Sequence, residues 1–246
     1  MLDGATLDTA TWGSGRVPIL LLHDGLGSID QWRNLPADLA AAADATVIAY
    51  DRPGHGTSTP VPSGPWPADW MTEQADALLE FIDQLGGAPP LLVGHSDGGS
   101  IALLAAAKQP HAVCGVVALA AHSHVEEVCV DAISAMRAKS DRIVAGLGRF
   151  HADAAAVFEA WSGVWVSDQF RLWDIRERLA SISAPTLIVQ GTEDEYGTDN
   201  MATSTARSVG PAGCRCVLLP GVGHLLHHQA PAAVIELIVG HLASFD

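Results

Sequence analysis

Three segments of the chain carry the residue types that nucleophilic catalysis requires, in the order serine, acid, histidine. Ser96 stands within residues 94–98, which fit the pattern G-x-S-x-G, between an apolar run ending at Val93 and an apolar helical stretch. A serine hydroxyl is a poor nucleophile until a base takes its proton, and the base needs an acid to orient it. Three adjacent acids at 193–195 and then His224 follow downstream. We therefore predict that Ser96 is a catalytic nucleophile.

The glycines around Ser96 have a steric reason. A serine on a sharp turn between a strand and a helix is held in a strained backbone conformation, and its neighbours pass too close for a Cβ. The helix that follows would direct its N-terminal N–H groups at an anion formed beside Ser96. The alternative is a Gly/Ser turn that leads into a core helix, because five-residue patterns also occur by chance. The acids and the histidine downstream favour the nucleophile.

The acids and the histidine both follow predicted strands. The acids at 193–195 come after the apolar run 185–190, and His224 comes after the run 216–219 in a glycine-rich turn. Loops after the strands of an open α/β sheet lie at its ligand-binding edge. Glu193, Asp194 and Glu195 compete for the orienting role, and their spacing alone leaves the choice open.

His224 has a rival interpretation as a metal ligand, because His227 and His228 follow it. No cysteine or acid stands near them at the spacing of a metal site. We therefore predict that the protein binds no metal and needs no cofactor. Acyl transfer instead needs two backbone N–H donors for the oxyanion. We expect one from Asp97, the residue after the serine, and the other from the loop at 23–28.

Short apolar runs alternate with helical patterns along most of the chain. This alternation predicts an α/β fold with a mostly parallel central sheet flanked by helices. Helices are expected after Pro67 and from Pro231, and a short edge hairpin is expected in residues 1–12 with a turn at Asp3-Gly4. The runs that predict strands are 17–22, 45–50, 91–93, 113–120, 185–190 and 216–219.

Residues 125–180 interrupt this alternation. They contain helical stretches and three tryptophans but no clear strand. We predict that residues 1–124 and 181–246 form the core and that residues 125–180 form a helical lid over the carboxyl ends of the strands. The alternative is a helical flank packed elsewhere on the sheet. The substrate pocket under such a lid is expected to include His122, Trp161 and Trp165.

Composition excludes several classes of function. The chain has 13 basic and 28 acidic residues, a net charge of −15, which repels nucleic acids and anionic membrane surfaces. We expect a soluble cytoplasmic protein, because no signal segment or membrane-length apolar run is found. It is expected to be a monomer or homodimer that binds a small-molecule acyl substrate. The four cysteines are expected to be reduced, since their spacing matches neither a redox motif nor a metal site.

Together these features resemble the α/β-hydrolase fold superfamily over nearly the whole chain. In closer detail the chain resembles the small lidded bacterial members, which include meta-cleavage C–C hydrolases, enol-lactone hydrolases and carboxylesterases. The matching pieces are Leu22-His23 with Gly25 and Trp32, residues 51–58 (Asp-Arg-Pro-Gly-His-Gly-Thr-Ser), the turn at 94–99, the turn at 191–194, and Gly223-His224.

The resemblance implies a role for each site residue. It implies Ser96 as nucleophile, His224 as base and Asp194 as orienting acid, with the N–H groups of Gly25 and Asp97 as oxyanion donors. The alternative acid position in some relatives follows the previous strand, and the turn there, residues 120–124, contains no acid.

The chain departs from the family pattern at two acidic positions. Asp24 replaces the usual glycine after His23, and Asp97 stands where an apolar residue is common. We expect the Asp24 carboxylate to turn away from the oxyanion and bond to backbone. The first strand of the sheet is expected to be short or missing.

We therefore expect a cofactor-independent serine hydrolase that cleaves an ester, lactone or thioester of a small to medium acyl substrate. The alternatives are a hydrolase of C–C bonds in vinylogous diketones and a non-catalytic receptor for a small molecule. Seven of the 13 basic residues lie in residues 125–180, so arginines of this segment are candidates to clamp an anionic substrate.

Overall fold

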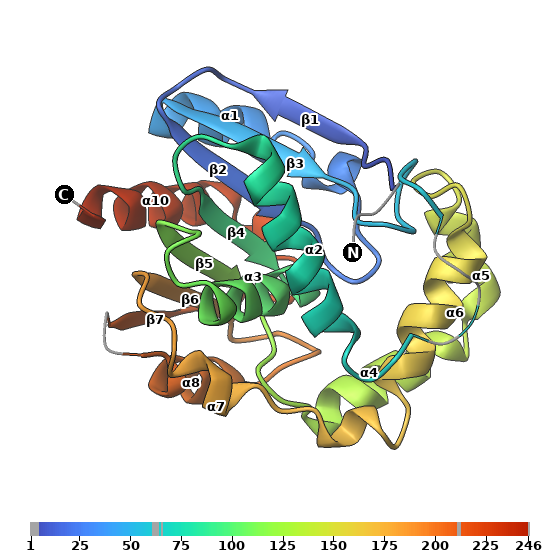
Figure 1. The fold of residues 1–246 in the computed structure, drawn as a ribbon. Helices are drawn as coiled ribbons and strands as arrows, with labels where there is room; N and C mark the ends of the chain where they lie inside the picture. Colours follow the sequence, from blue (N-terminus) through green and yellow to red (C-terminus); the bar gives the residue numbers. More distant parts are fainter. Residues whose placement is uncertain (1–4, 61–63, 65, 211–212, 246) are drawn as a thin grey trace.

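The computed structural model describes residues 5–60, 64, 66–210 and 213–245, so the predicted turn at Asp3-Gly4 lies outside the described residues. A seven-stranded sheet in the order β1-β3-β2-β4-β5-β6-β7 forms the centre of the fold (Figure 1). All neighbouring strands are parallel except β1, which pairs antiparallel with β3. The strands are β1 (Thr9–Trp12), β2 (Val17–Leu22), β3 (Ala45–Tyr50), β4 (Leu91–His95), β5 (Gly115–Leu119), β6 (Thr186–Gly191) and β7 (Cys214–Leu219).

The mostly parallel sheet predicted from the sequence is confirmed. A strand lies at every predicted apolar run. β4 extends two residues further than predicted, to His95, and β7 begins two residues earlier, at Cys214. The first strand is present but short: β1 is a four-residue edge strand that pairs with β3 from Thr9 opposite Tyr50. The paired residues of β1 and β3 lie 35 to 41 positions apart in the sequence.

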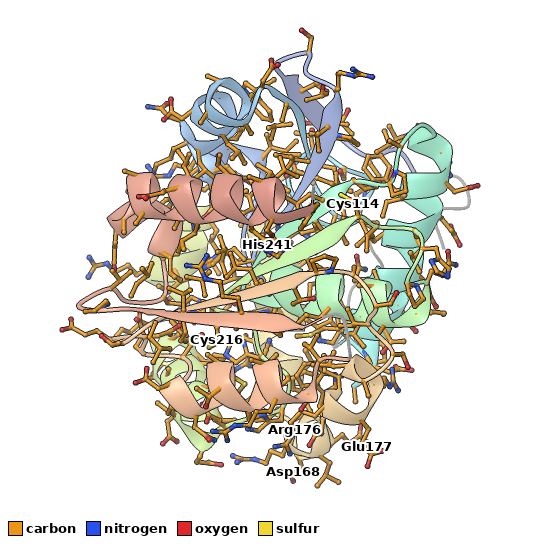
Figure 2. All side chains as sticks on the ribbon, turned by 90° about the vertical axis from the view of Figure 1, so that its left-hand side faces the viewer. Cys114, Asp168, Arg176, Glu177, Cys216 and His241 are labelled. Atoms are coloured by element: carbon orange, nitrogen blue, oxygen red, sulfur yellow. The ribbon has the colours of Figure 1, made fainter. Side chains whose placement is uncertain are left out.

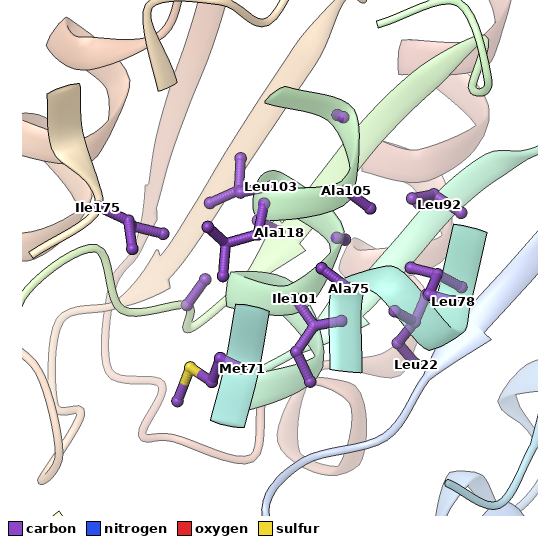
Figure 3. Close-up of a cluster of buried hydrophobic side chains, with 14 of the residues drawn as sticks. Leu22, Met71, Ala75, Leu78, Leu92, Ile101, Leu103, Ala105, Ala118 and Ile175 are labelled. Carbon is purple, nitrogen blue, oxygen red and sulfur yellow. The ribbon is translucent and has the colours of Figure 1, made fainter. Parts of the chain in front are cut away.

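Helices cover both faces of the sheet (Figure 1). Consecutive residues of a strand point to opposite faces, so Ile19 and Leu21 join the core beneath α1 and α10, whereas Leu20 and Leu22 join the core beneath α2 and α3. Figure 3 shows part of the second core. The helices of these layers are α1 (Leu35–Ala43), α2 (Trp70–Leu85), α3 (Asp97–Lys108), α8 (Asp199–Ser208), α9 (Leu226–Gln229) and α10 (Pro231–Leu242), with 3-10 turns η1 (Ile29–Trp32) and η3 (Ala243–Phe245).

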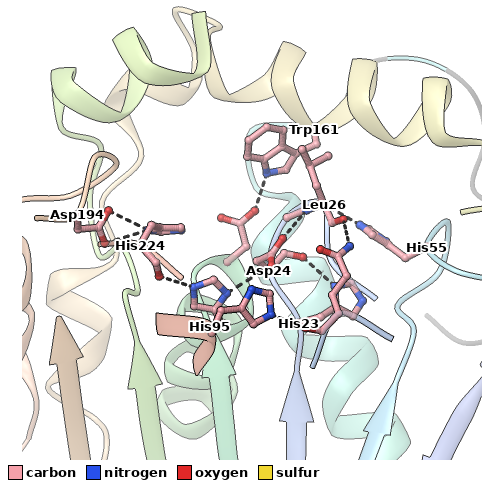
Figure 4. Close-up of polar contacts among 12 residues, drawn as sticks. His23, Asp24, Leu26, His55, His95, Trp161, Asp194 and His224 are labelled. Carbon is pink, nitrogen blue, oxygen red and sulfur yellow. Dashed lines mark hydrogen bonds and ion pairs between the residues drawn. The ribbon is translucent and has the colours of Figure 1, made fainter. Parts of the chain in front are cut away.

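Residues 125–180 form a mainly helical segment beyond the carboxyl ends of the strands (Figures 1 and 4). The two ends of the segment meet at the core, where His124 and Asp174 form an isolated β-bridge and the N–H of Ile175 donates to the carbonyl of Ser123 over 2.8 Å. The segment contains α4 (Glu127–Arg137), α5 (Ser140–Leu147), α6 (Ala154–Trp165), the 3-10 turn η2 (Phe170–Leu172) and α7 (Arg176–Leu179). Within the described part of the chain, no helix has the length and apolar character to cross a membrane.

α3 lies so close to the end of β2 that only glycine fits at position 98. A Cβ at Gly98 would lie 2.2 Å from the carbonyl oxygen of Leu22 and 2.5 Å from that of His23, and these backbone atoms cannot yield without moving the strand. We expect Gly98→Ala to lower the free energy of unfolding by about 1–3 kcal/mol, as overpacked cores do.

Gly240 on α10 provides the control, because no atom lies within 4 Å of a Cβ built there. Gly240→Ala is expected to stabilise by about 0.5–1 kcal/mol through helix propensity. The measurement is urea unfolding of both variants. Equal free energies of unfolding for Gly98→Ala and Gly240→Ala would contradict the close packing of α3 against the end of β2.

Candidate active site

Ser96 lies in the sharp turn that joins β4 to α3. Its φ of 52° and ψ of −122° are strained for a residue with a side chain, and its N–H donates to the carbonyl of Leu119 over 2.8 Å. A Cβ at Gly94 would lie 2.2 Å from the carbonyl oxygen of Gly98, so the turn closes only with glycine at that position. These are the steric reasons for glycine that the sequence pattern indicated.

His224 follows β7 and forms hydrogen bonds with the acid loop after β6 (Figure 4). Its Nδ1 lies 2.9 Å from both carboxylate oxygens of Asp194. The Asp194 carboxylate also accepts from the side-chain amide of Gln190 over 2.6 Å and from the N–H of Tyr196 over 2.8 Å. Its neighbour Glu195 instead accepts from the backbone N–H of His224 over 3.3 Å. Of the three adjacent acids, Asp194 is the one whose carboxylate bonds to the imidazole.

This pair of residues shifts the pKa of each partner. Burial alone would raise the pKa of Asp194, but the hydrogen bond and charge of His224 lower it below its usual value. Burial alone would lower the pKa of His224, but the hydrogen bond and charge of Asp194 raise it above 6.5. Because Nδ1 donates to an ionised carboxylate, Nε2 is the nitrogen left to accept a proton.

Ser96 and His224 line one cavity of about 190 Å³ beneath the 125–180 segment. The three residues predicted for the pocket, His122, Trp161 and Trp165, line it as well. The segment also contributes Cys129, Ile133 and Met136. Residues that follow the strands, in loops, in η1 and at the start of α3, contribute the rest: Asp24, Gly25, Leu26, Gln31, Asp97, Glu195, Tyr196 and Leu225.

The loop after β2 lines the cavity together with Ser96, and buried side chains form hydrogen bonds with its backbone carbonyls. Arg52 donates from Nη1 to the carbonyl of His23 and from Nη2 to that of Asp24, the latter over 2.6 Å. His55 and His151 continue the series: Nε2 of His55 lies 3.0 Å from the carbonyl oxygen of Gly25, and Nε2 of His151 lies 3.0 Å from that of Leu26. Four consecutive carbonyls are therefore bound. Sequence reasoning assigned no role to Arg52, His55 or His151, although the first two lie in the matching motif at 51–58.

The two residues predicted to supply oxyanion donors lie against the same tryptophan. Nε1 of Trp161 on α6 donates to Oδ2 of Asp97 over 2.7 Å (Figure 4). A Cβ at Gly25 would lie 1.9 Å from that Nε1 and 2.4 Å from that Oδ2, so only glycine fits here. Asp97 begins α3, and the N–H of a first helical residue has no partner within its helix.

The Asp24 carboxylate bonds to backbone, as predicted, but it also has an unpredicted partner. Oδ1 accepts from the N–H of Leu26 over 2.9 Å, and Oδ2 lies 3.4 Å from Nδ1 of buried His95 (Figure 4). Burial would raise the pKa of Asp24, but the contact with His95 lowers it well below its usual range. Nε2 of His95 in turn lies 2.9 Å from the carbonyl oxygen of His224, which links the two loops.

Three buried polar atoms in the cavity have no partner: Nε1 of Trp165 is a donor, and the other two are acceptors. Oδ1 of Asp97 is one, and burial raises the pKa of Asp97 to about 6. Nδ1 of His122 is the other: its Nε2 bonds to the carbonyl of Tyr196 over 3.1 Å, and burial lowers the pKa of His122 to about 4, so Nδ1 carries a free lone pair. Unpaired buried acceptors are costly, and a bound ligand with N–H or O–H donors would satisfy them.

The hypothesis of an anion clamp fails on geometry. Among the described residues that line the cavity, none is an arginine or a lysine. Three arginines of the segment bind its acids instead: Arg137 pairs with Glu159, Arg171 with Glu127 and Arg176 with Asp174. Figure 2 shows Arg176 at the outer surface. In the described part of the chain, no group of three or more histidines, cysteines or acids is arranged to hold a metal ion.

The chain is similar in sequence to a known protein family and to several of its members. The model of the family described as "Alpha/beta hydrolase family" matches residues 19–237. The human serine hydrolase BPHL is 30% identical over 240 residues, which cover 92% of this chain and 79% of that protein. The Escherichia coli esterase YbfF is 25% identical, with 92% of each chain covered.

A solved structure has the same fold. The enol-lactonase from Burkholderia xenovorans LB400 superposes with a TM-score of 0.75 at 22% identity, covering 98% of both chains. Some curated relatives are longer proteins, and the match then covers as little as 29% of their length.

Proposed function

Since the chain belongs to the alpha/beta hydrolase family and is a hydrolase of esterase- or lactonase-like type, we propose that it cleaves acyl substrates through Ser96, His224 and Asp194. The bond is an ester, lactone or thioester of a small to medium acyl group, and the 125–180 segment acts as a lid. The observation that carries this proposal is the hydrogen bond from His224 to Asp194 at the edge of a cavity that Ser96 also lines.

Acylation begins when Nε2 of His224 takes the proton of the Ser96 hydroxyl. Oγ of Ser96 forms a bond to the carbonyl carbon, and the carbonyl π electrons move to oxygen as an oxyanion. The N–H groups of Gly25 and Asp97 stabilise this charge, and the N-terminal end of α3 adds its dipole. Asp194 keeps the imidazole in the required tautomer and stabilises the imidazolium that forms.

Acylation ends when the tetrahedral intermediate collapses: the bond to the leaving group breaks, and His224 gives its proton to the departing oxygen or sulfur. Deacylation then repeats the same steps with water. Water loses a proton to His224 and attacks the acyl carbon on Ser96. Collapse of the second intermediate returns the proton to Oγ of Ser96 and releases the acid, so no cofactor enters the balance.

The acceptors in the cavity support a substrate that carries hydrogen-bond donors. Asp97 and His122 each offer an unpartnered atom, and Asp24 and Glu195 add negative charge to the wall. An ammonium group has three donors and no acceptor, so it suits such a wall. We therefore propose an amine-bearing acyl compound as the preferred substrate, in place of the anionic one that the charge count suggested.

The proposed nucleophile is tested by Ser96→Ala. Turnover of simple aryl esters is expected to fall by about 10⁴- to 10⁶-fold, because the three groups act as a unit. A fluorophosphonate probe should label the wild type at Ser96 and leave the variant unlabelled, with unchanged thermal stability as the control for folding. A variant with a tenth of the wild-type rate would refute the mechanism, and labelling without turnover in the wild type would indicate a receptor.

The proposed substrate class is tested with a matched pair of esters, one aminoacyl and one with a methyl group in place of the ammonium. Above pH 6 the ionised Asp97 carboxylate should favour the aminoacyl ester in kcat/KM by about tenfold or more, the worth of one hydrogen bond to a charged group. Because the pKa of Asp97 is raised to about 6, its charge is present above that pH and lost below it, so the preference should shrink as the pH falls.

Asp97→Asn supplies the control, since it retains the backbone N–H and removes the charge. It should abolish the preference while turnover of the methyl-capped ester persists. A wild type that prefers the methyl-capped ester at pH 7, where the amine is still largely protonated and Asp97 is ionised, rules out the amine.

A further inference from the structure

Arg52 is a buried cation that bonds to backbone carbonyls. It follows β3 and is 1% exposed. Its two terminal nitrogens donate to the carbonyls of His23 and Asp24, in the loop that faces Ser96. Burying a charge is expensive unless strong hydrogen bonds replace its water. The guanidinium therefore helps to fix the direction of two consecutive carbonyls. That of Asp24 also accepts from Nδ1 of His23 over 2.8 Å and from the N–H of Gly27 over 3.2 Å.

The second of these carbonyls determines where the N–H of Gly25 points. The carbonyl of Asp24 and the N–H of Gly25 belong to the same peptide group, which is planar and trans. In such a group the N–H points opposite to the carbonyl. Because Nη2 of Arg52 lies 2.6 Å from the Asp24 carbonyl oxygen, the N–H of Gly25 is directed away from Arg52. Gly25 lines the cavity with Ser96, so this orientation favours an acceptor bound there.

We propose that Arg52 is a positioning residue of the oxyanion hole: its charged hydrogen bond to the carbonyl of Asp24, the shortest that this oxygen accepts, directs the N–H of Gly25 at the oxyanion. This inference rests on the proposed function, in which that N–H is one of two oxyanion donors. It assigns to Arg52 a role in the chemical step without contact with the substrate.

The neighbouring contacts hold the peptide group from its other sides. His55 binds the next carbonyl, that of Gly25, over 3.0 Å. The indole of Trp161 lies so close to Gly25 that a Cβ would overlap its nitrogen. Rotation of the Asp24–Gly25 peptide group would therefore break the hydrogen bond to Arg52 or bring the backbone into a clash with Trp161. A donor fixed before the reaction needs no reorganisation as charge develops.

Two substitutions, Arg52→Lys and Arg52→Met, distinguish the effect of the guanidinium's hydrogen-bond geometry from the effect of its positive charge. Lysine keeps the positive charge but lacks the planar fork that binds two carbonyls at once. Methionine removes the buried charge and fills similar space, which buried ion sites often tolerate. The control is Arg137→Lys, because Arg137 binds Ser162 and Glu159 within the 125–180 segment.

The experiment compares ester turnover with binding of a trifluoromethyl ketone and of the matching alcohol. The ketone forms a tetrahedral oxyanion on Ser96, whereas the alcohol forms none. In Arg52→Lys we expect kcat to fall by about 10- to 100-fold, since a misaimed group costs this much. KM and alcohol affinity should stay within about twofold, and ketone affinity should fall by the same factor as kcat. Arg52→Met should lose more, and Arg137→Lys should resemble the wild type.

Two outcomes for the Arg52 variants would overturn the inference. Unchanged kcat and ketone affinity in a folded Arg52→Lys overturn it, and so does an equal loss of ketone and alcohol affinity, which marks a general change of the pocket. If the wild type neither turns over esters nor prefers the ketone to the alcohol, the proposed function fails and the inference falls with it. If the wild type turns over esters and prefers the ketone, but the Arg52 variants do not lose kcat and ketone affinity as expected, the proposed function is retained and the inference about Arg52 is rejected.

If neither variant folds, the wild type decides. Labelling with carbonyl-¹³C aspartate and ¹⁵N glycine selects the three Asp-Gly pairs of the sequence, at 3–4, 24–25 and 97–98. The amide proton of Gly25 should move strongly downfield when the ketone binds. A Gly25 resonance that does not move overturns the inference, because the N–H that Arg52 is said to aim would not be a donor.

Discussion

The hydrogen bond between His224 and Asp194 joins the loops after β7 and β6, and the proposed chemistry depends on it. Neither loop could make this contact without the parallel sheet, which brings the carboxyl ends of the two strands to one edge. Asp194 is itself held by Gln190 from the end of β6 and by the N–H of Tyr196. The carboxylate therefore stays ionised and oriented beside the imidazole, and the pKa of His224 rises as a result.

The opposite side of the cavity depends on buried polar groups that satisfy one another. Arg52, His55 and His151 bind successive carbonyls of the loop after β2. Burial lowers the pKa of His55 to about 3 and also lowers that of His151, so both rings are neutral and each has one N–H to donate. His151 lies just before α6, so the 125–180 segment takes part in shaping the loop as well as covering the cavity.

Local signals in the sequence predicted the sheet and the turn at Ser96, because apolar runs and glycines act over a few residues. The choice of Asp194 over Glu193 and Glu195 needed the family resemblance, since three adjacent acids have the same local pattern. The roles of Arg52 and His151 depend on contacts with residues 28 and 125 positions away, which no local pattern encodes. The anion clamp was wrong because a count of charges in a segment does not show the direction of its side chains. That the 125–180 segment acts as a lid stays a prediction.

The most direct measurement is the pH dependence of kcat/KM for the wild type, Asp194→Asn and Glu195→Gln on one neutral ester. His224 must be unprotonated to act as base and Asp194 raises its pKa, so wild-type activity should be lost as the pH falls through a value above 6.5. Asp194→Asn should lower kcat by about 10⁴-fold, as loss of the orienting carboxylate does in serine proteases, and should move the loss of activity to lower pH. Glu195→Gln should change both by little. The contrary result, an inactive Glu195→Gln beside an Asp194→Asn with the wild-type profile, would contradict the assignment of the His224–Asp194 pair.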